Sequence, residues 1–189
     1  MRKVILAVLI GGTSTTVATA QDIEAAARSY LDEAAASWVS DPVLIEAIRA
    51  QCDRTQDLSE DEIIEMDEAW RAEVGGFDMP TIDEVVMSTA SDFLRARVDE
   101  SAGVVSEIFV MDCVGLNVAA SGVTSDYWQG DEAKFTETYP KGPDAIHLSE
   151  LELDESTQTY QIQGSMPVVD PASNEVVGAI TIGLDAEAL

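Results

Sequence analysis

The sequence predicts an α+β fold in which N-terminal helices pack on one face of a five-stranded antiparallel sheet. Between residues 21 and 103, apolar side chains recur every three or four positions, which is the period of amphipathic helices. From residue 104 to residue 189, short apolar runs alternate with turn residues, which is typical of strands and hairpins. Because an antiparallel sheet buries one face, we expect the helices to cover that face.

Two helices are expected at the start of the helical region. Residues 22–38 place apolar side chains along one stripe that ends at Trp38. Asp41 and Pro42 supply an N-cap residue followed by proline at the first helical position. This pair predicts a second helix that runs to about residue 53.

Further helix starts follow along the chain. Ser59 and Glu62 have the spacing of a capping box, which predicts the start of a third helix. Thr81 and Glu84 have the same spacing and predict another start. A last helix is expected to pass through residues 93–98 and to close the helical region.

The sheet region is divided by its turn residues. Strands are expected at residues 104–112, 116–121, 145–148, 159–169 and 175–184, with a short helix at 131–139 and a turn at 154–157. In the fourth strand, the odd-numbered Gln161, Gln163 and Ser165 are polar, whereas the even-numbered residues are mostly apolar. Successive side chains of a strand point to opposite faces, so this strand is predicted to have a polar face.

The first twenty residues predict a secretory signal peptide. Arg2 and Lys3 precede the apolar run of residues 4–10, and small residues follow up to an expected cleavage site after Ala20. A membrane anchor is the less favoured alternative, because a span needs about 20 apolar residues. We therefore expect a periplasmic or secreted protein.

The composition is strongly acidic. The chain has 36 acidic and 10 basic residues and a formal net charge of −26. Such a chain repels nucleic acid and anionic membrane surfaces, so no nucleic-acid partner is expected. No segment has the D-x-D-x-D-G spacing of a calcium loop, and the sequence suggests no metal and no cofactor.

The chain contains two cysteines and one histidine. In an exported protein, Cys52 and Cys113 can form a disulfide, and two separate buried thiols are the alternative. His147 lies on a short predicted strand, and no second histidine is present to build a catalytic triad or a His/Cys metal site. The protein is therefore predicted not to be an enzyme.

Three segments carry a resemblance to a known family. IFVMDCVGLNVAAS (108–121), SDYWQGDEAKF (125–135) and SMPVVDPASNEVVGAITIGLD (165–185) resemble single Cache (PDC) extracytoplasmic sensor domains in a stand-alone exported form. The resemblance covers nearly all of the chain after the signal peptide and is firmest between residues 107 and 184. It implies a PAS-like five-stranded sheet and a small molecule bound between the sheet and its capping loops.

The resemblance also implies a set of ligand-binding residues. These are Asp126, Tyr127, Trp128, Asp131, Gln163, Ser165 and Asp170. The aromatic pair would wall the pocket, and the alternative is that Trp128 fills the core under a long loop. Amino-acid-binding members use an arginine near the pair, but no arginine follows Arg97. An amine or another small polar ligand is therefore expected.

The resemblance leaves the partner open. In receptors of this family the domain adjoins membrane segments, whereas this sequence stops at Leu189. We therefore expect a stand-alone domain that presents its ligand to a separate membrane receptor or transducer. The alternative is a protein–protein interaction module of the cell envelope without a small-molecule ligand. A homodimer through the N-terminal helix, whose Tyr30 and Trp38 could form core or interface, is a further expectation.

Overall fold

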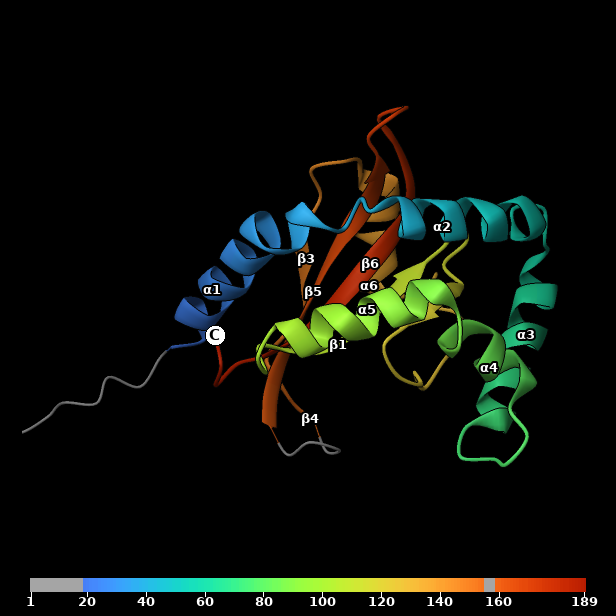
Figure 1. Ribbon diagram of the computed structural model, residues 1–189, viewed down its shortest axis with the longest axis horizontal. Coiled ribbons are helices and arrows are strands. Elements are labelled where there is room, and N and C mark those ends of the chain that lie inside the picture. The colour runs from blue at the N-terminus through green and yellow to red at the C-terminus, as the bar shows by residue number, and fades with distance from the viewer. Residues whose placement is uncertain (1–18, 155–158) are drawn as a thin grey trace, which may run out of the picture.

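The computed structural model describes residues 19–154 and 159–189 (Figure 1). The expected signal peptide lies outside this part of the chain except for its last two residues, and so do residues 155–157 of the expected turn. In the described part, helices precede an antiparallel sheet, so the predicted α+β class is confirmed. None of the helices described is long and apolar enough to cross a membrane.

The first part of the chain is helical. Its elements are α1 (Ala20–Glu33), η1 (Ala35–Ser37), α2 (Pro42–Thr55), α3 (Glu60–Glu73), α4 (Pro80–Val86) and α5 (Thr89–Glu100). The remaining elements are β1 (Val105–Met111), β2 (Asn117–Ala120), α6 (Ala133–Thr136), η2 (Tyr139–Lys141), β3 (His147–Leu148), β4 (Glu152–Asp154), β5 (Thr159–Asp170) and β6 (Glu175–Asp185).

Local capping explains most helix starts. Asp41 accepts a hydrogen bond from the backbone N–H of Val43 at 2.9 Å, which caps α2. Ser59 and Glu62 form the expected capping box of α3. The first helix is shorter than the expected 22–38, because the α-helix ends at Glu33 and a 3₁₀ turn continues the chain.

A helix begins within one residue of the start expected at Thr81, but the Thr81 side chain is not its cap. α4 begins at Pro80, and Thr81 lies inside the helix. The side chain of Thr81 does not cap α4, because its hydroxyl donates to Glu73 Oε1 at 2.7 Å. The backbone N–H groups of Thr81 and Ile82 donate to Glu73 Oε2 at 2.9 and 3.0 Å. A carboxylate from α3 therefore caps α4, which the local sequence pattern does not show.

The sheet is antiparallel throughout. Its order is β2-β1-β6-β5-β3, with β4 also paired to β5. The structure has six strands where the sequence predicts five, because the three-residue β4 was missed. β5 has 12 residues and pairs with β3 only at Gly164 and Ser165. β4 occupies the free edge of β5 opposite residues 159–161.

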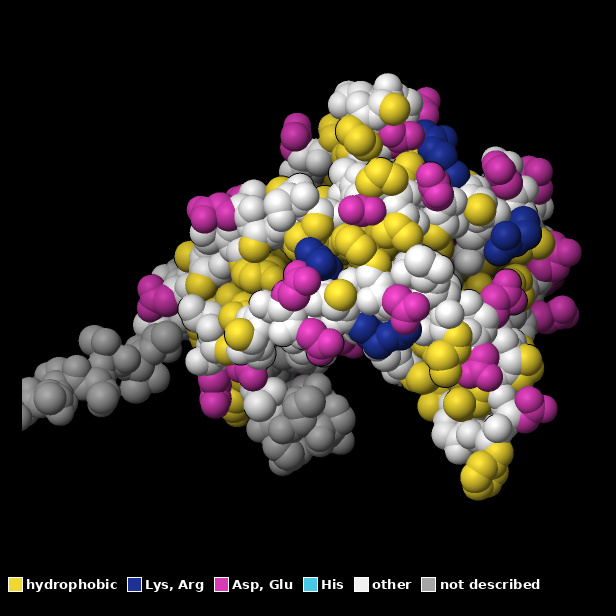
Figure 2. Space-filling view, in the orientation of Figure 1, with side chains coloured by type: hydrophobic (Ala, Val, Ile, Leu, Met, Phe, Trp, Pro, Cys, Tyr) yellow, Lys and Arg dark blue, Asp and Glu magenta, His cyan; other side chains and the backbone are white. Residues whose placement is uncertain are grey.

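α1, α2 and α5 cover one face of the sheet and lie in front of it in Figure 1. Their buried residues pack on the even-numbered face of β5 and on β1 and β6. The largest side chains of this core are Leu31, Leu44, Ile48 and Leu94 from the helices and Ile108, Ile162, Ile180 and Ile182 from the strands. The apolar stripe of α1 is therefore used inside the chain, with Tyr30 and Trp38 at the margin of this core. Figure 2 shows apolar side chains between α2 and α5, with carboxylates scattered around them.

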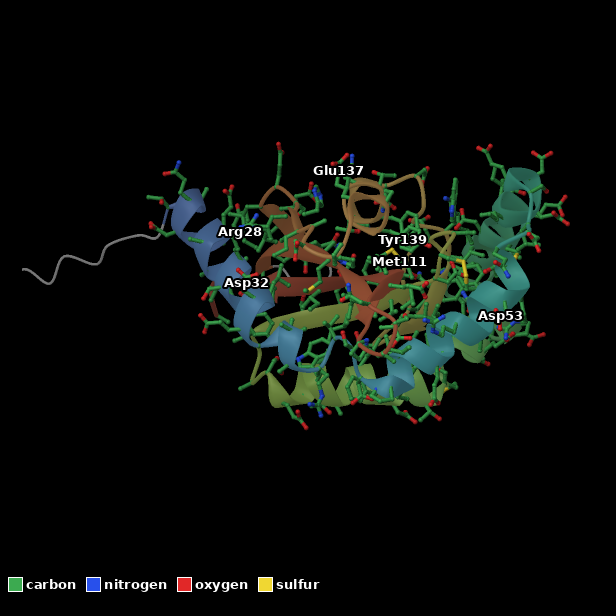
Figure 3. All side chains as sticks on the ribbon, turned by 90° about the horizontal axis from the view of Figure 1, so that it is seen from above. Arg28, Asp32, Asp53, Met111, Glu137 and Tyr139 are labelled. Atoms are coloured by element: carbon green, nitrogen blue, oxygen red, sulfur yellow. A yellow bond between two sulfur atoms is a disulfide. The ribbon has the colours of Figure 1, made fainter. Side chains whose placement is uncertain are left out.

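The opposite face of the sheet is covered only in part. Glu137 and Tyr139, in the connection that contains α6 and η2, lie on the far side of the sheet from α5 (Figure 3). Phe135 of α6 and Phe109 of β1 belong to a second core that also includes Trp70 of α3. This core covers the part of the face near β1 and leaves the polar face of β5 outside it.

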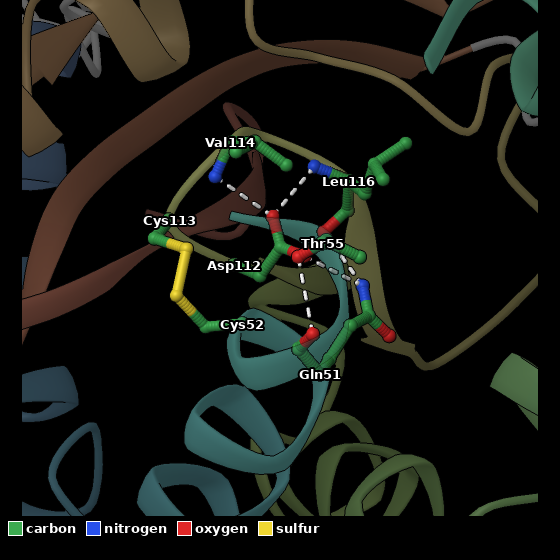
Figure 4. The surroundings of a disulfide bond; sticks show 7 residues. All are labelled: Gln51, Cys52, Thr55, Asp112, Cys113, Val114 and Leu116. Carbon is green, nitrogen blue, oxygen red and sulfur yellow. Dashed lines mark hydrogen bonds between the residues drawn. A yellow bond between two sulfur atoms is a disulfide. The ribbon is translucent and has the colours of Figure 1, made fainter. Parts of the chain in front are cut away.

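A disulfide and a buried carboxylate join α2 to the β1–β2 turn (Figure 4). Cys52 and Cys113 are bonded, with their Cα atoms 5.7 Å apart. Beside them, Asp112 is fully buried and accepts hydrogen bonds from Thr55 Oγ1 at 2.7 Å and Gln51 Nε2 at 3.1 Å. The sequence alone left the state of the two cysteines open.

Candidate functional site

A cavity of about 310 Å³ lies on the face of the sheet opposite α1, α2 and α5, between α6 and the edge formed by β5, β3 and β4. We call it the sheet cavity. Its floor is Gln161, Gln163 and Ser165, its wall is His147, Ser149 and Glu152, and its α6 side is Glu132, Ala133 and Lys134. All but one of these residues are polar or charged, so the cavity suits a polar ligand.

The alternation of β5 creates the polar floor. Ile162 faces the helices and is buried in the main core, and the odd-numbered Gln163 and Ser165 face the cavity. Antiparallel pairing places His147 directly opposite Ser165. The histidine therefore joins the same face of the sheet through the register of β3.

Hydrogen bonds fix the floor. Gln163 Nε2 donates to Glu107 Oε1 at 3.0 Å, and the backbone N–H of Gln163 donates to Ser149 Oγ at 2.9 Å. The hydroxyls of Ser165 and Thr181 are 2.9 Å apart and both residues are fully buried. Because these groups are held by neighbours, the floor is largely preformed for binding.

Lys134 is held at the α6 side of the sheet cavity. Its Nζ donates to Gln129 Oε1 at 3.1 Å and pairs with Glu132 Oε2 at 2.9 Å. The ammonium also lies 5.3 Å from the centroid of the Phe109 ring, within the range of a cation–π contact. These contacts fix a positive charge at the cavity and place a carboxylate next to it.

The lining supplies hydrogen-bonding groups of both kinds. Glu132 and Glu152 carry two negative charges against the one positive charge of Lys134. Among residues 19–154 and 159–189, no three His, Cys, Asp or Glu side chains lie close enough to hold a metal ion. The arrangement can hold a small polar molecule through several hydrogen bonds and favours one that is neutral or positively charged.

The Tyr-Trp pair lies away from the sheet cavity. Tyr127 is 5% exposed, and its ring stacks on Trp70 with centroids 5.1 Å apart. Trp128 Nε1 donates to the carbonyl of Val114 at 2.9 Å. The backbone N–H groups of the pair donate to Asp67 Oδ1 at 2.8 and 3.0 Å. The pair thus anchors its segment to α3 and to the β1–β2 turn.

An arginine does accompany the aromatic pair, contrary to the expectation from the sequence. Arg71 Nε lies 2.7 Å from Asp126 Oδ1, and Arg71 Nη2 lies 2.6 Å from Asp67 Oδ2. This arginine comes from α3, far from the aromatic pair in sequence. The residues after Arg97 therefore do not reveal it. The guanidinium of Arg71 is therefore already paired with the carboxylates of Asp67 and Asp126.

The two remaining predicted residues also do not line the sheet cavity. Asp131 is exposed and directly precedes Glu132, which lines the sheet cavity. Asp170 lies at the end of β5, where its Oδ2 is 2.7 Å from Arg49 Nη2. The backbone N–H of Ala172 and the guanidinium of Arg49 lower the pKa of Asp170.

The seven predicted residues do not share one cavity. Gln163 and Ser165 line the sheet cavity, whereas Tyr127 lines a groove between helices. Ligand contact stays a prediction for all seven residues. Sequence reasoning missed Lys134 and His147 as lining residues, because their positions depend on the fold of the α6 connection and on the β3 register.

Comparison with known proteins gives structural matches only. No family model matches the sequence, and no curated protein matches it. The sensor domain of the histidine kinase DctB from V. cholerae is 13% identical with a TM-score of 0.49, and the match covers 89% of this chain and 54% of that one. The ligand-binding domain of the Campylobacter jejuni chemoreceptor Tlp3 in complex with 4-methylisoleucine is 11% identical with a TM-score of 0.39, and the match covers 79% and 61%.

A third structural match also has low sequence identity. The ligand-binding domain of the Pseudomonas aeruginosa amino acid chemoreceptor PctC, in complex with GABA, is 12% identical with a TM-score of 0.41, and the match covers 84% of this chain and 61% of that one. The matched structures are sensor domains of histidine kinases and chemoreceptors. This chain spans between 54% and 61% of the length of these three.

Proposed function

We propose that this chain is a ligand-binding sensor domain that takes a small polar molecule into the sheet cavity. The observation that carries the proposal is the polar floor of β5, where Gln163 and Ser165 face a cavity instead of a core. Elsewhere on this face the sheet packs on the apolar residues of the second core. A polar, hydrogen-bonded and partly enclosed surface is typical of a binding site.

The cavity favours an amine or another small polar metabolite. Its volume of about 310 Å³ is at the small end of ligand sites, so the ligand is small. Lys134 is already neutralised by Glu132, which leaves Glu152 as an additional carboxylate at the wall. The wall carboxylate therefore offsets the desolvation of a cationic ligand and repels an anion.

We propose that binding is not coupled to catalysis. His147 has no hydrogen bond to Ser149 or Glu152 in the part of the chain that is described, although all three line the cavity. The Ser149 hydroxyl donates to the carbonyl of Glu150 at 2.7 Å instead. A nucleophile needs a base within hydrogen-bond reach, and this geometry does not supply one.

We further propose that the domain is exported and acts with a separate membrane protein. The Cys52–Cys113 bond supports export, because disulfides persist in oxidising compartments. Phe77 is fully exposed on the loop between α3 and α4, and Met87 at the end of α4 is largely exposed. A contiguous apolar surface around these two side chains would suit contact with another protein.

Thermal unfolding of the purified protein with a panel of amines, amino acids, carboxylates and divalent cations tests the proposal. A ligand of the folded state adds about 2.7 kcal/mol of stability at one hundred times its Kd. We expect an amine or another small polar molecule to raise the Tm, and Gln163→Ala to reduce this shift.

The control is Gln56→Ala, which removes an exposed glutamine outside the sheet cavity and should keep the full shift. A wild-type Tm that no compound raises would contradict ligand binding. A shift that Gln163→Ala retains in full would place the ligand elsewhere.

A further inference from the structure

A second hollow, which we call the helix groove, lies between α2, α4 and α5 beside the edge strand β2. Its volume is about 510 Å³, and it shares no lining residue with the sheet cavity. Its inner surface is largely apolar, with Val85 and Ala90 each 3% exposed and Val118 7% exposed. The groove is large enough for a small organic ligand.

Tyr127 brings a hydroxyl to the helix groove. The residue is 5% exposed and lines the groove, while its ring stacks on Trp70. Within the described residues, the hydroxyl makes no hydrogen bond, although the backbone N–H of Tyr127 donates to Asp67. The hydroxyl is not one of the buried atoms that lack a partner among the described residues, so it is accessible from the groove and free to bond to a ligand there.

Gln51 supplies a second polar side chain, of which only the amide nitrogen is hydrogen-bonded within the described residues. The residue is 7% exposed and lines the groove. Its Nε2 donates to Asp112 Oδ2 at 3.1 Å and to the carbonyl of Asn117 at 3.2 Å. Its amide oxygen points away from Asp112 in Figure 4 and accepts no hydrogen bond from the residues described. An acceptor thus lies in the groove together with the Tyr127 hydroxyl.

The rim of the helix groove is acidic. Glu46 and Glu84 are exposed carboxylates that line it, and Arg54 is the cation that accompanies them. The guanidinium of Arg54 donates to the carbonyl of Ala50 at 3.1 Å, which holds it along α2. Two negative charges against one positive charge favour a cation at this entrance.

We propose that the helix groove binds a small aliphatic ammonium ion. The alkyl chain would lie along Val85, Ala90 and Val118, where its burial stabilises the complex. The ammonium would donate hydrogen bonds to the amide oxygen of Gln51 and the hydroxyl oxygen of Tyr127, with the rim carboxylates balancing its charge. This site is independent of the sheet cavity.

The ionisation of Tyr127 agrees with this role. Burial and the negative charges of Asp112 and Glu84 raise the pKa of Tyr127 to about 12. The hydroxyl therefore stays neutral at physiological pH and can accept one hydrogen bond while donating another.

Calorimetric titration of the purified protein with n-pentylamine at pH 7 tests the proposal. The amine is protonated at this pH, and n-pentanol is the uncharged comparison compound. Pentylamine should bind, and pentanol should bind about tenfold more weakly or not at all. Tyr127→Phe removes only the hydroxyl, which has no hydrogen-bond partner among the described residues. The Tm of this variant should therefore equal that of the wild type. Its affinity for pentylamine should fall about fivefold to tenfold.

Two further variants locate the binding. Ala47→Leu adds bulk to a half-buried lining position and should abolish binding without unfolding the protein. Tyr139→Phe is the matched control, because Tyr139 is another stacked tyrosine and lies outside the groove. No binding of pentylamine, equal binding of pentanol, or an affinity that neither Tyr127→Phe nor Ala47→Leu changes would overturn the proposal.

Discussion

Asp112 shows how a single side chain can hold together two distant parts of the chain. Its Oδ1 accepts the backbone N–H groups of Val114 and Leu116 at 2.9 and 3.0 Å, which shapes the β1–β2 turn. Its Oδ2 accepts from Gln51 and Thr55 of α2. A buried carboxylate with these partners fixes the position of α2 on the hairpin.

We expect Asp112→Ala to lower the free energy of unfolding by about 3 kcal/mol, because it leaves several buried donors without an acceptor. Urea denaturation at pH 7 measures the change. Asp53→Ala, at an exposed position of α2, is the control and should stay within about 0.5 kcal/mol of wild type. A similar small effect for both variants would show that Asp112 does not join α2 to the turn.

Asp170 contributes a pH-dependent term to stability. Hydrogen bonds from the backbone N–H of Ala172 and from Arg49 lower its pKa in the folded state. Aspartates of the unfolded chain titrate at a pKa of about 3.9. Near and below this pH, the folded protein therefore binds fewer protons at Asp170 than the unfolded chain does. The free energy of unfolding consequently rises with pH in this range. The contribution is complete at neutral pH and is lost as the pH falls through the lowered pKa.

Asp170→Asn should therefore differ most from wild type at pH 7, and the difference should shrink steadily between about pH 5 and pH 3. Urea unfolding of both proteins at a series of pH values tests this. Asp144→Asn serves as the control, since Asp144 is exposed and has no ion pair within the described residues. A stability difference that does not change with pH would contradict the assignment.

At the scale of elements, the contact of α1 with the sheet depends on a glycine. A Cβ atom at Gly164 of β5 would lie 2.6 Å from Leu31 Cδ1 and 3.1 Å from Leu31 Cδ2. Leu31 is fully buried between α1 and the sheet. The absence of a side chain at residue 164 thus allows the helix to approach the strand closely.

We expect Gly164→Ala to destabilise the fold by about 1 to 2 kcal/mol, because Leu31 must move within a packed core. Chemical denaturation gives the value. Gly122→Ala is the matched control, since a Cβ there meets no atom within 4 Å. If the two variants behaved alike, α1 would not be closely packed on β5.

The elements also show which boundaries local sequence can predict. The caps at Asp41 and Ser59 act within a few residues of themselves, so their patterns were sufficient. Thr81 has the pattern of a cap but bonds to Glu73, which lies on another helix. A helix begins within one residue of the predicted start, but a contact between helices replaces the local cap.

For the whole molecule, the Cys52–Cys113 bond closes a long covalent loop. It joins residues 61 positions apart and links the helical region to the sheet. In the chain-entropy model, a loop of this length restricts the unfolded state by about 4 kcal/mol. The disulfide and Asp112 act on the same junction.

Replacing both cysteines by serine should lower the free energy of unfolding by about 4 kcal/mol. Urea denaturation with and without a reducing agent measures this. Reduction of the wild type should produce the same loss and should leave the double variant unchanged. A wild type that is insensitive to reduction would show that the bond contributes little to stability.

Local sequence patterns are enough to predict most of the elements and the two faces of β5. Helical periodicity, caps and strand alternation act over a few residues, so they predicted the α+β class and the polar row that includes Gln163 and Ser165. Only the tertiary structure decided which polar groups meet. The register of β3 places His147 beside Ser165, and α3 places Arg71 beside Asp126, because strand pairing and helix packing join residues that lie far apart in the chain.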